Sequence, residues 1–187
     1  MNNFIIGLIS FPIMYLFDHL QFKNHPLKVY AGLIGFGGLI FAIIEMAMDN
    51  EKLAISPAFS LVGYLLFIPF VFLLYKSFFL EIPFNETYVK KEKEQKLVST
   101  GAYSLTRHPG VIWLFFSILG LSLITRSWYL FLATFIYSLA NCLYVYYQEK
   151  LFLLMIPGYY NYQQQVPMLI PNKKSINNYF TAGRKLL

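Results

Sequence analysis

The sequence predicts an all-α protein: a polytopic membrane helical bundle of about five transmembrane helices with a C-terminal helical hairpin. Three observations predict this fold class. First, 57% of the 187 residues are hydrophobic and only 13% are charged, which is outside the usual balance of soluble domains. Second, the apolar residues are gathered in five long runs. Third, Lys and Arg are concentrated in alternate connections between those runs.

The apolar runs supply the expected helices, at residues 4–20, 29–48, 58–80, 111–125 and 127–147. A helix needs about 20 residues to cross the hydrocarbon core, so the second, third and fifth runs are long enough and the other two are marginal. Only Arg126 and Ser127 separate the last two runs, which predicts a tight hairpin. Pro69 is expected to kink the third helix. The glycines of the second run are expected to allow close helix packing: Gly32, Gly35, Gly37 and Gly38.

The basic residues predict the orientation of the helices, because Lys and Arg accumulate in cytosolic loops. If the connection 18–28 is cytosolic, all fifteen Lys and Arg residues except Lys52 and Arg126 lie on that side. We therefore expect a multi-pass integral membrane protein with a cytosolic C-terminus. Its net charge of +6 indicates contact with the lipid bilayer and no nucleic acid, since the basic residues flank apolar runs.

We expect a single membrane domain over residues 1–187. Its parts are N-terminal transmembrane helices (1–80), a cytosolic connection (81–110), a transmembrane hairpin (111–147) and a cytosolic C-terminal segment (148–187). Because a hairpin brings its two ends together, the connection and the C-terminal segment are expected to emerge side by side. They would then enclose a cytosolic pocket.

The connection ends in Arg107-His108-Pro109, where Pro109 suits the first position of the fourth helix. Arg107 and His108 therefore stand beside a helix N-terminus, where the dipole favours negative charge. An anion held by both side chains would resolve this conflict. The alternative is that both reach lipid phosphates.

The fifth helix carries a polar stripe on one face, formed by Tyr137, Asn141, Tyr144 and Gln148. Such a stripe indicates a bundle interior or a cavity, or simple packing of interfacial tyrosines. Glu149 closes the same helix, where a carboxylate opposes the dipole. Asp18 and Glu45 lie at predicted helix ends, and His19 and His25 flank the first loop. None of these four residues receives a catalytic role.

Several motifs follow one another in a distinctive order. They are Leu97-Val98-x-Thr100-Gly101-x-Tyr103-x-x-x-Arg107-His108-Pro109, the hairpin, Glu149, Tyr159-x-x-Tyr162 and Val166-Pro167. This set resembles the isoprenylcysteine carboxyl methyltransferase and phospholipid methyltransferase superfamily over residues 95–171. The resemblance implies S-adenosyl-L-methionine-dependent methyl transfer at the cytosolic membrane face, to a lipophilic or small-molecule acceptor.

The resemblance also implies a set of site residues. Those expected to bind the cofactor are Gln95, Lys96, Leu97, Val98, Tyr103, His108, Pro109, Gly110, Val111, Glu149, Tyr159 and Tyr162. Arg107 and Glu149 are expected to be catalytic, and the acceptor is expected near Tyr137, Asn141 and Tyr144. Arg107 or His108 suits the cofactor carboxylate, Glu149 its ammonium group, and the face of Tyr103 or Tyr159 its sulfonium. No metal is expected, because in-line methyl transfer needs none.

The sequence departs from the superfamily pattern at four places. Val111 replaces a usual Tyr, Gln148 replaces one of two acidic residues, and Tyr144 or Val145 replaces the basic residue that binds the acceptor. Two residues of the usual spacing are also missing between Gly158 and Tyr159. Two alternatives therefore stay open. One is an NADPH-dependent membrane reductase of the steroid-reductase-like type, although the Gly-Glu pair usual in those proteins is missing after His108. The other is a degenerate, non-catalytic membrane protein. The sequence determines neither the acceptor nor the oligomeric state.

Overall fold

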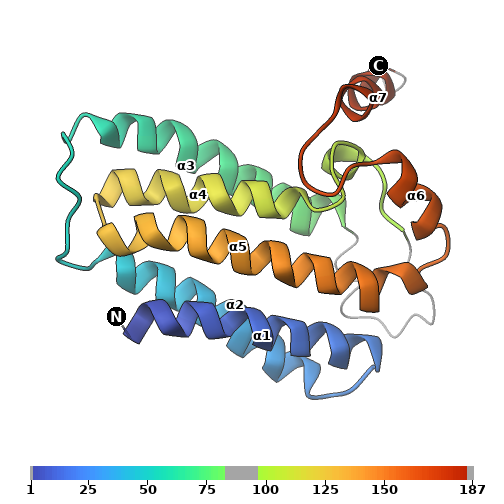
Figure 1. Cartoon of the computed structure of the whole chain (residues 1–187), viewed down its shortest axis with the longest axis horizontal. Helices are drawn as coiled ribbons and strands as arrows, with labels where there is room; N and C mark the ends of the chain where they lie inside the picture. Colours follow the sequence, from blue (N-terminus) through green and yellow to red (C-terminus); the bar gives the residue numbers. More distant parts are fainter. Residues whose placement is uncertain (1, 83–96, 185–187) are drawn as a thin grey trace.

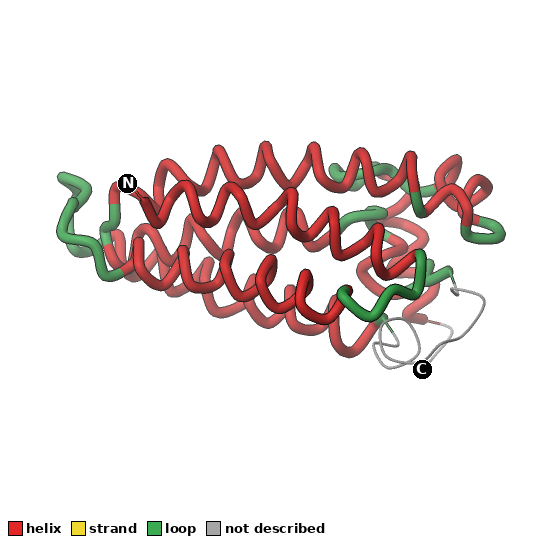
Figure 2. The backbone as a smooth tube through the Cα atoms, turned by 90° about the horizontal axis from the view of Figure 1, so that it is seen from below, coloured by secondary structure: helices red, strands yellow, loops and turns green. Residues whose placement is uncertain are grey.

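The computed structural model describes residues 2–82 and 97–184, which form a bundle of long helices running side by side (Figures 1 and 2). The expected all-α fold is confirmed, since the described residues contain no β-strand. The long helices are α1 (Asn2–Phe22), α2 (Lys28–Ala47), α3 (Phe59–Tyr75), α4 (Pro109–Thr125) and α5 (Trp128–Leu151). The shorter elements are the π-helix η1 (Lys76–Glu81), η3 (Gly101–Ser104), η4 (Leu153–Met155), α6 (Tyr159–Gln165) and α7 (Lys173–Arg184).

Four helical segments are long and apolar enough to cross a membrane: Asn2–Phe22, Lys28–Ala47, Phe59–Glu81 and Trp128–Met155. The first helix, marginal in the sequence, is therefore long enough. α4 is equally apolar but has only 17 residues, so it remains shorter than a typical span. Large apolar side chains on the outer faces are exposed, as lipid-facing residues are, with Leu33 and Leu61 each 68% exposed.

The helices pack in two pairs against the central α5: α1 with α2, and α3 with α4 (Figure 1). The α3–α4 contact depends on two glycines, because a Cβ on Gly120 would lie 2.6 Å from the backbone nitrogen of Phe67. A Cβ on Gly63 would lie 2.7 Å from the Gly120 carbonyl oxygen. In α2, Gly35 and Gly38 face α1 as the packing interpretation expects, whereas Gly37 meets nothing within 4 Å.

The tight hairpin between α4 and α5 is confirmed. Arg126 takes the left-handed conformation that ends α4, with φ of 54°. Ser127 then caps α5, since its hydroxyl accepts a hydrogen bond from the Leu130 N–H and donates one to the Met46 carbonyl. The beginning of α4 and the end of α5 therefore lie at the same end of the bundle (Figure 1).

Candidate functional site

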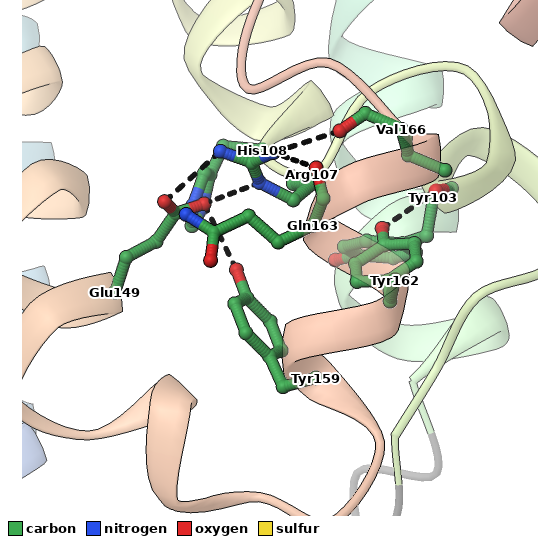
Figure 3. A network of polar contacts seen from close by, with 8 residues as sticks. All are labelled: Tyr103, Arg107, His108, Glu149, Tyr159, Tyr162, Gln163 and Val166. Carbon is green, nitrogen blue, oxygen red and sulfur yellow. Dashed lines mark hydrogen bonds and ion pairs between the residues drawn. The ribbon is translucent and has the colours of Figure 1, made fainter.

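The Arg-His-Pro motif and the C-terminal segment lie side by side at this end of the bundle, as the hairpin predicts. The Arg107 N–H donates to the Pro167 carbonyl at 2.9 Å, and the His108 N–H donates to the Met168 carbonyl at 3.1 Å. These backbone hydrogen bonds hold the segment before α4 against the segment after α6. The side chains of both segments then converge on the last turns of α5 (Figure 3).

Glu149 is the centre of a buried polar network (Figure 3). Its Oε1 accepts hydrogen bonds from Arg107 Nε at 2.6 Å, from the Tyr159 hydroxyl at 2.9 Å, and pairs with His108 Nε2 at 2.9 Å. Its Oε2 accepts one from Arg107 Nη2 at 3.0 Å. The side chains of Arg107 and Glu149 are only 8% and 7% exposed. The pair is thus a bidentate ion pair largely shielded from water.

The same guanidinium also fastens the C-terminal segment to α5. Arg107 Nη1 donates to the carbonyls of Gln163 at 2.9 Å and Val166 at 2.8 Å. Four of the five N–H groups of a guanidinium are therefore in use. The anion beside the N-terminus of α4 is accordingly the Glu149 carboxylate. The cation before α4 and the anion at the end of α5 each oppose a helix dipole, and each neutralises the other.

Two buried tyrosines of α6 complete this side of the site. The Tyr159 and Tyr162 rings meet edge to face at 5.6 Å, and Leu97 packs against the cluster that they form with Val166. Burial raises the pKa of each hydroxyl well above its usual range, so both stay neutral donors. Tyr159 donates to Glu149, and Tyr162 donates to the Tyr103 carbonyl at 2.6 Å. Tyr162 therefore holds the motif segment, residues 97–109, directly, and Tyr159 holds it through Glu149, which pairs with Arg107.

The π-helix η1 supports the other side of the motif segment. Glu81 Oε2 accepts a hydrogen bond from the Ala102 N–H at 2.9 Å, and Lys76 pairs with the same carboxylate at 3.3 Å. The Tyr103 hydroxyl donates to the Ser77 carbonyl at 3.4 Å. Tyr103 is thus held at its hydroxyl by η1 and at its carbonyl by α6.

Gly101 is expected to tolerate no side chain. Its φ is +60°, and a Cβ there would lie 2.6 Å from the Glu81 carboxylate. Replacing Gly101 with alanine should therefore lower the free energy of unfolding by about 1–3 kcal/mol and displace Tyr103. Thermal unfolding of the detergent-purified protein measures this change. A variant as stable as the wild type would show that η3 relaxes without loss.

Of the other residues expected to bind the cofactor, some lie in or near the first turn of α4 and two are not described by the structure. Pro109 and Val111 are buried in the first turn of α4, and Val98 is half-buried. A Cβ on Gly110 would meet the Phe78 ring at 3.3 Å, so this residue packs against η1. Gln95 and Lys96 lie outside the described residues, as does the charged run 90–96.

The residues of the polar stripe on α5 do not form one site, because their side chains contact different parts of the bundle. Tyr137 is fully buried in the bundle core and donates to the Phe4 carbonyl at 2.8 Å. Twelve residues separate it from Glu149, roughly 18 Å along the helix. Asn141 is buried between them. Tyr144 instead donates to Asp18 at the same end of the bundle as Glu149. An acceptor near Tyr137, Asn141 and Tyr144 stays a prediction, and of these three residues Tyr144 is the nearest to Glu149 along α5.

Sequence reasoning missed two features of the site. Within the described part of the chain, the Thr106 hydroxyl is buried and has no hydrogen-bond partner, although its residue is only 1% exposed. Its position beside Arg107 was the available signal. The carbonyls of Gln163 and Val166 have no sequence signature, because any residue supplies them. Among residues 2–82 and 97–184, no group of three or more His, Cys, Asp or Glu is placed to hold a metal ion.

Comparison with known protein families identifies the family of this chain. A family model described as phospholipid methyltransferase matches residues 59–159, more than half of the chain, from the start of α3 to the start of α6. The match contains the Arg-His-Pro motif, the hairpin and Glu149, which confirms the resemblance seen in the sequence. No curated protein and no solved structure matches the chain. The chain therefore belongs to the phospholipid methyltransferase family of membrane methyltransferases.

Proposed function

We propose that the protein transfers a methyl group from S-adenosyl-L-methionine to a lipophilic or small-molecule acceptor at the cytosolic face of the membrane. The observation that supports this most directly is the buried network joining Arg107 and His108 to Glu149 and Tyr159. It brings the family motif, the end of α5 and α6 to one point. The excess of Lys and Arg at this end of the bundle supports the cytosolic orientation.

The residues present fit two charged groups of this cofactor, its ammonium and its sulfonium, whereas Arg107 and His108, expected to meet its carboxylate, are engaged with Glu149. Glu149 Oε1 has three hydrogen-bonding partners and Oε2 has one, so Oε2 has acceptor capacity left for an ammonium group. The partnerless Thr106 hydroxyl offers a further polar contact. The tyrosine faces of Tyr103 and Tyr159 suit a sulfonium. When bound, the cofactor supplies an electrophilic methyl group.

In this proposal the residues of the chain bind the cofactor and orient it. Glu149 contacts the cofactor, and Arg107 is a positioning residue that fixes both carboxylate oxygens of Glu149. His108 and Tyr159 prevent that carboxylate from rotating. The apolar cluster of Leu97, Tyr159, Tyr162 and Val166 keeps water from this side of the network. The alignment of cofactor and acceptor in a desolvated site accelerates the methyl transfer.

Binding of the demethylated product, S-adenosylhomocysteine, tests the proposal. At 100 times its dissociation constant it should stabilise the detergent-purified protein by about 2.7 kcal/mol. Thr106→Val should weaken this stabilisation without destabilising the free protein, because the hydroxyl it removes has no partner in the described structure. Thr106→Ser, which keeps the hydroxyl, is the matched control.

Three outcomes decide the matter. Stabilisation by the product that Thr106→Val weakens supports the assigned site. No stabilisation of the wild type at millimolar S-adenosylmethionine or S-adenosylhomocysteine contradicts the proposed function. Stabilisation by NADPH in its place would favour the reductase alternative.

A further inference from the structure

The helix α7 lies outside the polar network of Glu149, yet it is fixed at the same end of the bundle. Asn172 caps it, because the Asn172 Oδ1 accepts a hydrogen bond from the Ser175 N–H at 2.8 Å. The Ser175 hydroxyl in turn accepts one from the Asn172 N–H at 3.1 Å. Ser175 is fully buried, and α7 packs against η3. One face of α7 is therefore attached to the motif segment.

The axis of α7 crosses the axis of the bundle. Figure 1 shows α7 nearly end-on, whereas the long helices run across the view. Because the long helices are the ones that cross the membrane, α7 lies parallel to the membrane surface. The chain before it is held level with the beginning of α4, since the His108 N–H donates to the Met168 carbonyl. This is the depth at which lipid headgroups begin.

A second face of α7 is apolar and exposed. Lys173, Ile176 and Phe180 are three and four residues apart, so they lie on one side of the helix. Ile176 is 41% exposed and Phe180 is 63% exposed. Lys173 is exposed at the beginning of the same stripe. Large apolar side chains bordered by a basic residue, on a helix that lies flat, are typical of helices at the membrane interface.

The charge of this part of the chain has one sign. Residues 150–187 contain five Lys and Arg residues and no Asp or Glu, and Arg184 and Lys185 follow the apolar stripe. Lys173 and Lys174 are exposed, and within residues 2–82 and 97–184 neither forms an ion pair. Each Lys beside an anionic membrane strengthens binding roughly five-fold. Charge complementarity therefore selects a surface of anionic lipid as the partner of this face.

We propose that α7 lies in the headgroup layer and binds anionic lipid. Ile176 and Phe180 face the lipid chains, and Lys173 and Lys174 bind the headgroup phosphates. This interaction goes beyond methyl transfer and does not depend on it. Because α7 packs against η3, lipid bound here also holds the motif segment.

Hydrogen–deuterium exchange of the full-length protein in lipid nanodiscs tests the proposal. In discs of phosphatidylcholine with about one-third phosphatidylglycerol, the α7 amides should exchange at least about five-fold more slowly than in phosphatidylcholine alone. The double variant Lys173→Gln with Lys174→Gln should reduce this difference to less than about two-fold. Lys23→Gln, an exposed lysine between α1 and α2 at the same end of the bundle, is the matched control and should keep the full difference.

Salt provides a second measurement on the unaltered protein. Raising the ionic strength from about 0.1 M to about 1 M shortens the Debye length from about 10 Å to about 3 Å. Most of the slowing caused by phosphatidylglycerol should then disappear, whereas exchange in the spanning part of α5 should stay the same.

Three results would overturn the inference. The first is equal exchange of α7 in the two kinds of disc, and the second is a double lysine variant that keeps the full difference. The third is slowing that occurs only in discs holding two copies of the protein, because it would assign the exposed face to a second copy. The cofactor takes part in none of these measurements, so their outcome is separate from that of the S-adenosylhomocysteine test.

Discussion

Replacement of Glu149 with alanine is expected to lower the free energy of unfolding by about 3–5 kcal/mol, because it leaves the Arg107 guanidinium buried without a counter-charge. The Arg107 side chain is only 8% exposed, so water cannot easily replace the lost carboxylate. The Tyr159 hydroxyl loses its acceptor in the same change. The C-terminal segment should therefore loosen together with the end of α5.

Thermal unfolding of the detergent-purified protein measures this loss, with a thiol-reactive dye reporting on Cys142, the single cysteine. Glu51→Ala, an exposed carboxylate, is the matched control and should change stability by less than about 0.5 kcal/mol. The double variant Arg107→Met with Glu149→Ala should recover part of the loss, because it leaves no uncompensated charge. A Glu149→Ala protein within about 1 kcal/mol of the wild type would show that the ion pair is readily replaced by water.

Gly120→Ala is expected to separate α3 from α4 and to destabilise the bundle by about 1–3 kcal/mol. The added methyl group would lie 2.6 Å from the Phe67 nitrogen and 2.8 Å from the Gly63 carbonyl oxygen. These are backbone atoms, so no side chain can rotate away to make room. The loss should exceed the roughly 1 kcal/mol that alanine gains over glycine in a helix.

Gly37→Ala provides the matched control for this substitution. It places the same methyl group in a helix where nothing lies within 4 Å, so it should stabilise the protein by up to about 1 kcal/mol. The two variants should thus shift the midpoint of thermal unfolding in opposite directions. A Gly120→Ala protein as stable as Gly37→Ala would mean that α3 and α4 are not in close contact in the membrane.

The sequence located the site by two local conflicts but could not connect them. A cation beside the N-terminus of α4 and an anion at the end of α5 each oppose the helix dipole, and each was visible in a few residues of sequence. Their pairing joins Arg107 to Glu149 across 42 residues. It depends on how α5 is rotated about its axis relative to the motif segment. Periodicity within one helix carries no such information about a neighbouring helix.

The polar stripe of α5 shows the same limit. Its spacing correctly placed Tyr137 and Tyr144 on one face, yet the two side chains meet different parts of α1, the Phe4 carbonyl and the Asp18 carboxylate. The first contact lies in the bundle core, and the second lies at the end of the bundle that holds Glu149. For the same reason the sequence did not connect Asp18 with Tyr144, since it showed Asp18 only as an acidic residue near a helix end.

Hydropathy, turn residues and motif order were therefore enough to establish a membrane bundle, its terminal hairpin and the family, because each depends on residues close together in the chain. The partners of Arg107, Glu149 and Asp18 follow from the packing of helices that are distant in sequence. Hydrogen bonds and ion pairs act over a few ångströms, so a small rotation of α1 or α5 would exchange one partner for another. That sensitivity is why the chemistry of this end of the bundle had to be read from the folded structure.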